Sequence, residues 1–191
     1  MVEAIDHANQ FIQYANMRNE IECLKYIEKY SDFYDTTNGF STPLSIACTR
    51  GLEQVVYKLI AKGVNVNLRT NSGYTPLHYA ASFKNNILNT LIKHGANLDD
   101  DYNGMRAIMF AINTKCNGNV IILLKAGATF VDIIDSHISR GGYPDIIQCV
   151  RNVYRQRIRS IIDTNDDNTM AACFRTTYAI KLVDIISEFI I

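Results

Sequence analysis

The 191-residue sequence lacks tryptophan, contains only three prolines and has no excess of either charge sign. Its 19 Lys and Arg residues balance its 19 Asp and Glu residues, so no overall field favours nucleic acid or a membrane surface as the partner. The longest aliphatic run, Val120 to Leu124, is far too short to span a bilayer. Because the first residues contain neither a basic segment nor an apolar core, we expect no secretory signal and a cytoplasmic or nuclear location.

The five cysteines are widely spaced and form no CxxC pair. This pattern fits neither a zinc site nor a disulfide framework, so we expect free thiols in a reducing compartment. Cys116 lies in a turn beside Lys115, and its thiol is expected to be accessible. Neither the cysteines nor the four histidines have partners at catalytic or metal-ligand spacing. The sequence therefore predicts no enzyme, no cofactor and no metal.

Two short patterns recur along the chain with nearly the same period. The segment Thr-Pro-Leu-Ser-Ile-Ala-Cys at 42–48 returns as Thr-Pro-Leu-His-Tyr-Ala-Ala at 75–81, a step of 33 residues. The segment Lys-Gly-Val-Asn at 62–65 returns as His-Gly-Ala-Asn at 94–97 and as Ala-Gly-Ala-Thr at 126–129, in steps of 32 residues. Two independent landmarks with one period indicate tandem structural units.

Each unit has the signals of two helices. Thr42 and Thr75 are N-cap candidates, and the prolines after them suit the first turn of a helix. A second helix then carries apolar residues at i, i+3 and i+4 spacing. It ends at a glycine, which is typical of a helix C-terminus. These glycines are Gly63, Gly95 and Gly127.

The segments 73–81 and 91–97 together resemble the ankyrin repeat, because proline, histidine, alanine and glycine all fall in its register. The resemblance implies two antiparallel helices and an outward hairpin in each unit, and hence an all-α solenoid. It also implies that His78 and Thr75 brace the hairpin through hydrogen bonds.

The match to the repeat is strongest in the middle of the chain. We expect core ankyrin repeats over 39–128, a capping ankyrin-like repeat over 1–38 and a degenerate repeat over 129–152. Residues 153–191 do not match and are expected to form a C-terminal helical cap, although a short partner-binding appendix is the alternative. Solenoid ends are expected to be atypical, because their outer face meets water.

Ankyrin proteins bind partners through their hairpin tips and the concave face of the first helices. Because stacking places equivalent residues of successive repeats side by side, residues at one repeat position form a row along this surface. Aromatic residues, methionine and arginine are enriched at binding hot spots. Asn71 is added because it lies at a hairpin tip. The residues predicted to bind a partner are Phe40, Arg50, Asn71, Tyr74, Phe83, Tyr102 and Met105. For Phe40 and Phe83, local packing between repeats is the alternative.

Two charged segments can each be interpreted either as solvent-exposed surface or as a binding site. Asp99, Asp100 and Asp101 are adjacent and do not form a calcium loop, so a solvated hairpin is expected. Arg151, Arg155 and Arg159 form a secondary basic patch, since a spacing of four residues places them along one stripe of a helix. A solvated helix face explains this stripe, and an acidic partner, phosphate or RNA is the alternative.

The sequence thus predicts an interaction module that binds another protein, as a monomer or weak oligomer and without a membrane span. It resembles small stand-alone ankyrin proteins of large DNA viruses or intracellular microbes, which engage host factors. One alternative is a decoy of a host transcription factor, similar to an inhibitor of NF-κB. Another is binding of nucleic acid or an acidic partner through the basic patch. Catalysis by the unmatched 39 residues at the C-terminus is disfavoured by their small number.

Overall fold

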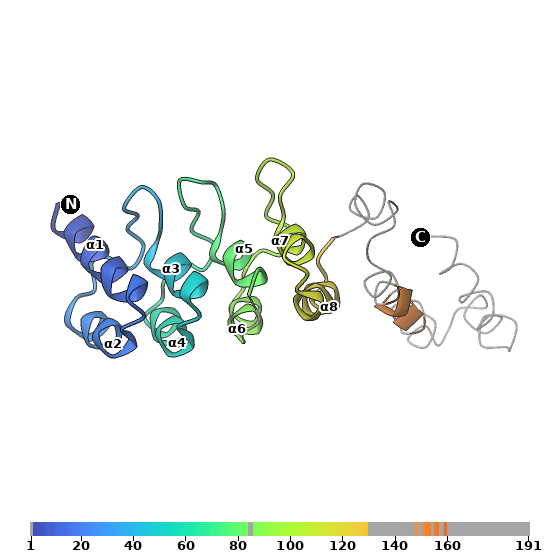
Figure 1. The fold of residues 1–191 in the computed structure, drawn as a ribbon, viewed down its shortest axis with the longest axis horizontal. Coiled ribbons are helices and arrows are strands. Elements are labelled where there is room, and N and C mark those ends of the chain that lie inside the picture. Colours follow the sequence, from blue (N-terminus) through green and yellow to red (C-terminus); the bar gives the residue numbers. More distant parts are fainter. Residues whose placement is uncertain are drawn as a thin grey trace, which may run out of the picture. The chain divides into compact units, whose positions relative to one another are not determined.

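The computed structural model describes residues 2–83 and 86–129, together with residues 148, 151–153, 155, 156 and 159. The chain divides into two compact units, Met1–Ala128 and Thr129–Ile191. In the first unit, eight α-helices follow one another as four antiparallel pairs (Figure 1). The predicted segments 129–152 and 153–191 lie almost wholly outside the described residues.

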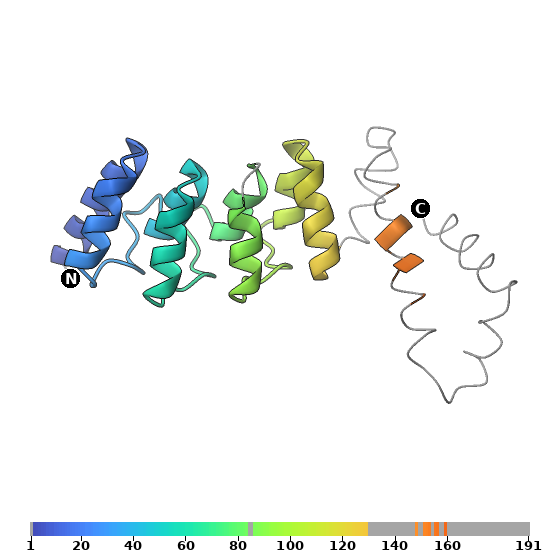
Figure 2. The ribbon, with the colours of Figure 1, turned by 90° about the horizontal axis from the view of Figure 1, so that it is seen from below.

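The first unit is a stack of helix pairs. The first helices of the pairs are α1 (Val2–Asn16), α3 (Pro43–Arg50), α5 (Pro76–Ala81) and α7 (Ala107–Asn113). The second helices are α2 (Glu20–Lys29), α4 (Glu53–Ala61), α6 (Ile87–Lys93) and α8 (Asn117–Ala126). The first helices form one row and the second helices another, and the hairpin loops project beyond the row of first helices (Figures 1 and 2). This confirms the predicted all-α solenoid with hairpin loops.

The first helices begin where the sequence predicts. The Thr42 hydroxyl accepts the Ser45 amide at 3.1 Å, and the Ser45 hydroxyl accepts the Thr42 amide at 2.9 Å. This reciprocal cap satisfies two amides that the helix itself leaves unpaired. We number the pairs α3–α4, α5–α6 and α7–α8 as the first, second and third repeats. In the third repeat Arg106 precedes α7 and makes no side-chain cap hydrogen bond. Arg106 and Ala107 stand where the other two repeats have Thr-Pro, and α7 still forms there without a side-chain cap.

Small side chains let the first helices approach one another. Ala47, Ala80 and Ala111 are fully buried at equivalent positions of α3, α5 and α7. The second helices contribute larger apolar residues such as Val55 and Ile87, which are also buried. The core therefore runs continuously along the stack, and each pair buries its apolar surface only against its neighbours.

Ion pairs join the second helices on the outside of the stack. The Glu28 carboxylate contacts both Lys58 and Lys62, the latter at 2.9 Å. Hydrogen bonds from these two lysines lower the pKa of Glu28 to about 2. Because the group is exposed, screening by solvent keeps the contribution to stability small.

Candidate interaction surface

We number the hairpins that precede α3, α5 and α7, closed at residues 38–41, 70–74 and 102–105, as the first, second and third. Four aromatic rings gather where the second and third hairpins meet the first helices. Tyr74 packs edge-on against Tyr102 at 5.7 Å, against Tyr79 at 6.3 Å and against Phe110 at 4.9 Å between ring centroids. All four side chains are half-buried, so each keeps part of its ring in solvent. We call Tyr74, Tyr79, Tyr102 and Phe110 the aromatic hairpin cluster. Its members come from two successive repeats.

In each hairpin the residue directly before the helix N-cap accepts a backbone hydrogen bond from the other arm, and the N-caps are Thr42, Thr75 and Arg106. The Asn38 amide donates to the Ser41 carbonyl, and the Thr70 amide donates to the Tyr74 carbonyl at 3.0 Å. In the third hairpin Tyr102 and Met105 exchange backbone hydrogen bonds. Ser41, Tyr74 and Met105 therefore occupy the same place in their hairpins. Phe40 directly precedes Ser41 in the first hairpin, and its side chain is 81% exposed.

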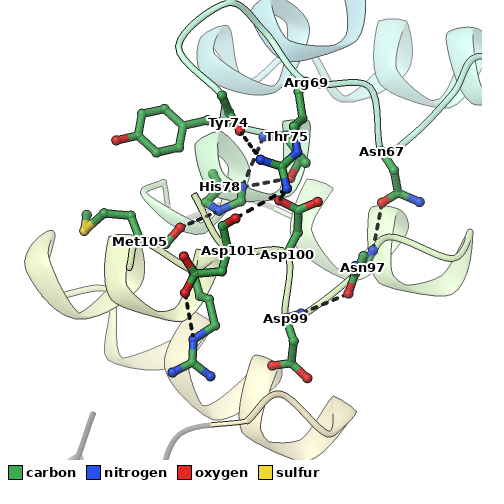
Figure 3. Close-up of polar contacts among 12 residues, drawn as sticks. Asn67, Arg69, Tyr74, Thr75, His78, Asn97, Asp99, Asp100, Asp101 and Met105 are labelled. Atoms are coloured by element: carbon green, nitrogen blue, oxygen red, sulfur yellow. Dashed lines mark hydrogen bonds and ion pairs between the residues drawn. The ribbon is translucent and has the colours of Figure 1, made fainter. Parts of the chain in front are cut away.

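His78 links the second repeat to the third (Figure 3). Its Nδ1 accepts the Thr75 amide at 3.1 Å, so the ring proton lies on Nε2, which donates to the Met105 carbonyl at 2.9 Å. The imidazole is fully buried. Burial lowers the pKa of His78, an effect that outweighs the opposing hydrogen bond to Met105. The neutral imidazole is thus a structural brace, as the resemblance implied, and it fixes the position of Met105.

Arg69 of the second hairpin holds the third hairpin in place. Its guanidinium pairs with Asp100 at 2.9 Å and lies over the Tyr102 ring at 5.9 Å. A further contact reaches the Asp101 carbonyl at 3.4 Å, as Figure 3 shows. The Asp100 side chain is only 12% exposed. The prediction of a fully solvated acidic hairpin is therefore wrong for Asp100, because a cation from the neighbouring repeat covers it.

Gly73 allows Tyr102 to approach the second hairpin. Its φ is +81°, and a Cβ at this position would overlap the Tyr102 ring. Gly104 holds the same place in the third hairpin, with φ +75° and open space around the position of a Cβ. At Gly73 the missing side chain therefore allows both a left-handed backbone and the close packing of the Tyr102 ring, whereas at Gly104 it allows only the left-handed backbone.

The remaining predicted residues are not members of the aromatic hairpin cluster. Asn71 is exposed at the second hairpin tip, and its amide group lies beside Gly39 of the first hairpin. At the other ends of the first helices, Arg50 donates two hydrogen bonds to the Asn16 side-chain oxygen, at 2.7 and 3.1 Å. Phe83 follows α5 and is 42% exposed. The structure thus brings Tyr74, Tyr102 and Met105 together, and it places Phe40, Arg50 and Phe83 outside the cluster.

Two members of the cluster were missed from the sequence. Tyr79 and Phe110 each directly precede the small alanine of their first helix. Ile46 holds the same position in α3 and is only 7% exposed. A comparison of this repeat position would have shown a large apolar or aromatic residue in each of the three repeats, and hence a signal for this surface.

In the part of the chain that the structure describes, the burial of the thiols and the grouping of possible metal ligands disfavour both reactive thiols and a metal site. Burial raises the pKa of the Cys23 thiol to about 11 and also raises that of Cys48, so both are protonated at neutral pH. Cys116 is only 6% exposed, so the expectation that its thiol is accessible is wrong. Among the residues described, no group of three or more His, Cys, Asp or Glu could hold a metal ion. No helix within the same part of the chain is long and apolar enough to cross a membrane.

The secondary basic patch belongs to the second unit. Its described residues are helical, with Arg151 and Arg155 half-buried and Arg159 exposed. Arg155 approaches the Asn152 side-chain oxygen at 3.4 Å. A role of these arginines in binding stays a prediction.

Comparison with known proteins agrees with the repeat geometry. The family model for ankyrin repeats, in 3 copies, matches residues 44–134. The human transient receptor potential cation channel subfamily A member 1 is 31% identical over 125 residues, 62% of this chain and 11% of that protein. An ankyrin repeat protein of Rickettsia bellii is 32% identical over 94 residues, 48% of this chain and 37% of the relative. A fowlpox virus ankyrin repeat protein is 34% identical over 94 residues, 47% of this chain and 28% of the relative. The chain therefore spans well under half the length of these relatives.

Proposed function

Because the chain is an ankyrin-repeat protein, and such repeats are in general protein–protein interaction modules, we propose that it binds a partner protein through its hairpin tips and first-helix face. The contact residues in this proposal are Phe40, Arg50, Asn71, Tyr74, Phe83, Tyr102 and Met105, to which the geometry adds Tyr79 and Phe110. A host protein is the expected partner, since the relatives include ankyrin repeat proteins of Rickettsia bellii and fowlpox virus.

The aromatic hairpin cluster is the observation that carries this proposal. Aromatic side chains supply large contact area at a small entropic cost, and they concentrate at the centres of protein interfaces. Here Tyr74 is packed by three rings, so its orientation is set before any partner binds. His78 and Arg69 hold the hairpins that present these rings. A surface that is already ordered loses little conformational freedom on binding.

Affinity capture from a eukaryotic lysate tests the proposal. The wild-type chain is expected to retain a protein that the double variant Tyr74→Ala/Phe83→Ala loses, with a drop in affinity of about tenfold or more. Both side chains are partly exposed, so their removal is expected to affect binding more than folding. Thermal unfolding of both chains checks that their stabilities are equal.

Tyr57 provides the matched control. It is 46% exposed on α4, in the row of second helices. The variant Tyr57→Ala therefore removes an exposed aromatic ring outside the proposed surface and is expected to keep the captured protein. Equal capture by all three chains would contradict the assignment of the surface.

A further inference from the structure

Asn119 is a polar residue at a core position of the repeat. The glycines that end the second helices align Asn119 of α8 with Val55 of α4 and Ile87 of α6. Val55 is 0% exposed, Ile87 is 1% exposed and Asn119 is 5% exposed. An amide at such a position is costly unless both of its N–H groups find acceptors.

The Asn119 amide reaches into the preceding repeat and finds them there. Its Nδ2 donates to the Ala81 carbonyl at 2.9 Å and to the Phe83 carbonyl at 2.8 Å. Ala81 is the last residue of α5, where the helix leaves carbonyl groups without intrahelical partners. Phe83 lies in the turn that follows α5. The side chain thus closes the C-terminus of a helix from another repeat.

Backbone amides close the same end of α3 and of α7. After α3, Gly51 adopts φ +72° and its amide donates to the Ala47 and Cys48 carbonyls. After α7, Lys115 adopts φ +56°, and the Cys116 amide reaches the Ala111 carbonyl at 2.8 Å. The residue after α5 is Ser82, with φ −81°, and its amide donates to the Ala80 and Tyr79 carbonyls. The Asn119 side chain adds its own hydrogen bonds to the Ala81 and Phe83 carbonyls at this helix end.

A second side chain from the same region acts on the same turn. The Cys116 thiol lies 3.3 Å from the Ser82 carbonyl, within hydrogen-bonding distance. We propose that Asn119, assisted by Cys116, is a positioning residue that fixes the Phe83 turn at the edge of the binding surface. The importance of Phe83 rests on the proposed function, but the positioning itself can be measured without a partner.

Amide hydrogen exchange, followed by NMR, tests the positioning. The Phe83 amide donates to the Ala80 carbonyl at 3.3 Å and reports on the turn. The Ile46 amide donates to the Thr42 carbonyl in α3 and reports on opening of the stack elsewhere. The variant Asn119→Val copies Val55 and removes the side-chain amide, including both N–H donors. It is expected to accelerate exchange of the Phe83 amide roughly tenfold while leaving the Ile46 amide within about twofold.

Two further variants separate positioning from stability. Asn119→Asp keeps the shape and loses the donors, so it is expected to accelerate the Phe83 amide at least as much. Asn113→Asp makes the same change at an exposed position of α7 and is expected to leave both amides unchanged. Equal acceleration of the Phe83 and Ile46 amides would show that Asn119 acts only on overall stability. Unchanged exchange in Asn119→Val would remove the inference altogether, and neither result would bear on partner binding.

Discussion

The variant His78→Leu is expected to lower the free energy of unfolding by about 2–4 kcal/mol, since it leaves buried groups in two repeats without partners. The Met105 carbonyl loses its donor, and the Thr75 amide loses its acceptor. Urea denaturation at pH 7.5 measures the effect. His94→Leu is the control, because His94 is exposed at the end of α6 and its ring hydrogen-bonds to the Thr90 carbonyl of its own helix, not to a second repeat. A loss below about 0.5 kcal/mol would contradict the structural role of the imidazole.

The same residue predicts a pH dependence. Burial lowers the pKa of His78 in the folded chain below its ordinary value of 6.5. As the pH falls below about 6.5, the unfolded chain binds a proton that the folded chain still excludes, so stability is lost. The loss continues down to the folded pKa, at a rate of at most about 1.4 kcal/mol per pH unit. The stability gap between wild type and His78→Leu should therefore narrow in acid.

The second large effect is expected at Gly73. Gly73→Ala forces a Cβ into a backbone of φ +81° and into the Tyr102 ring. Strain and overpacking together should lower the free energy of unfolding by about 2–4 kcal/mol. Because Tyr102 must move, the variant should also weaken binding of the captured partner.

The variant Gly104→Ala separates backbone strain from the clash with the Tyr102 ring. Gly104→Ala meets the same backbone strain at φ +75° but no neighbouring atom within 4 Å. It is expected to lower the free energy of unfolding by only about 1–2 kcal/mol. Denaturant unfolding of both variants gives the comparison. Equal losses would contradict the packing of Tyr102 on Gly73.

The helix pairs could be predicted because their signals are local. The cap at Thr42, the glycines Gly63 and Gly95 and the repeated apolar stripe each act within one unit. Three such signals at one period leave little freedom in the fold. The all-α stack and the brace at His78 were therefore both predicted correctly.

The surface was predicted less completely, because it depends on contacts between units. Arg69 covers Asp100 only because neighbouring hairpins lie side by side, and spacing along the chain does not show this. Asn119 was also missed, although a polar residue at the position of Val55 and Ile87 is a visible departure. Comparing buried positions between repeats for polar exceptions would have found it.

The central claim is that the hairpin and first-helix face binds a protein, and site-specific photo-cross-linking tests it most directly. The photoreactive residue p-benzoyl-phenylalanine would replace Phe40, Phe83 or, as the control, Tyr57, whose side chains are 81%, 42% and 46% exposed. Irradiation in lysate is expected to join the partner to the chain from positions 40 and 83 and not from position 57. Cross-linking from position 57 alone would place the partner on the second helices and contradict the account.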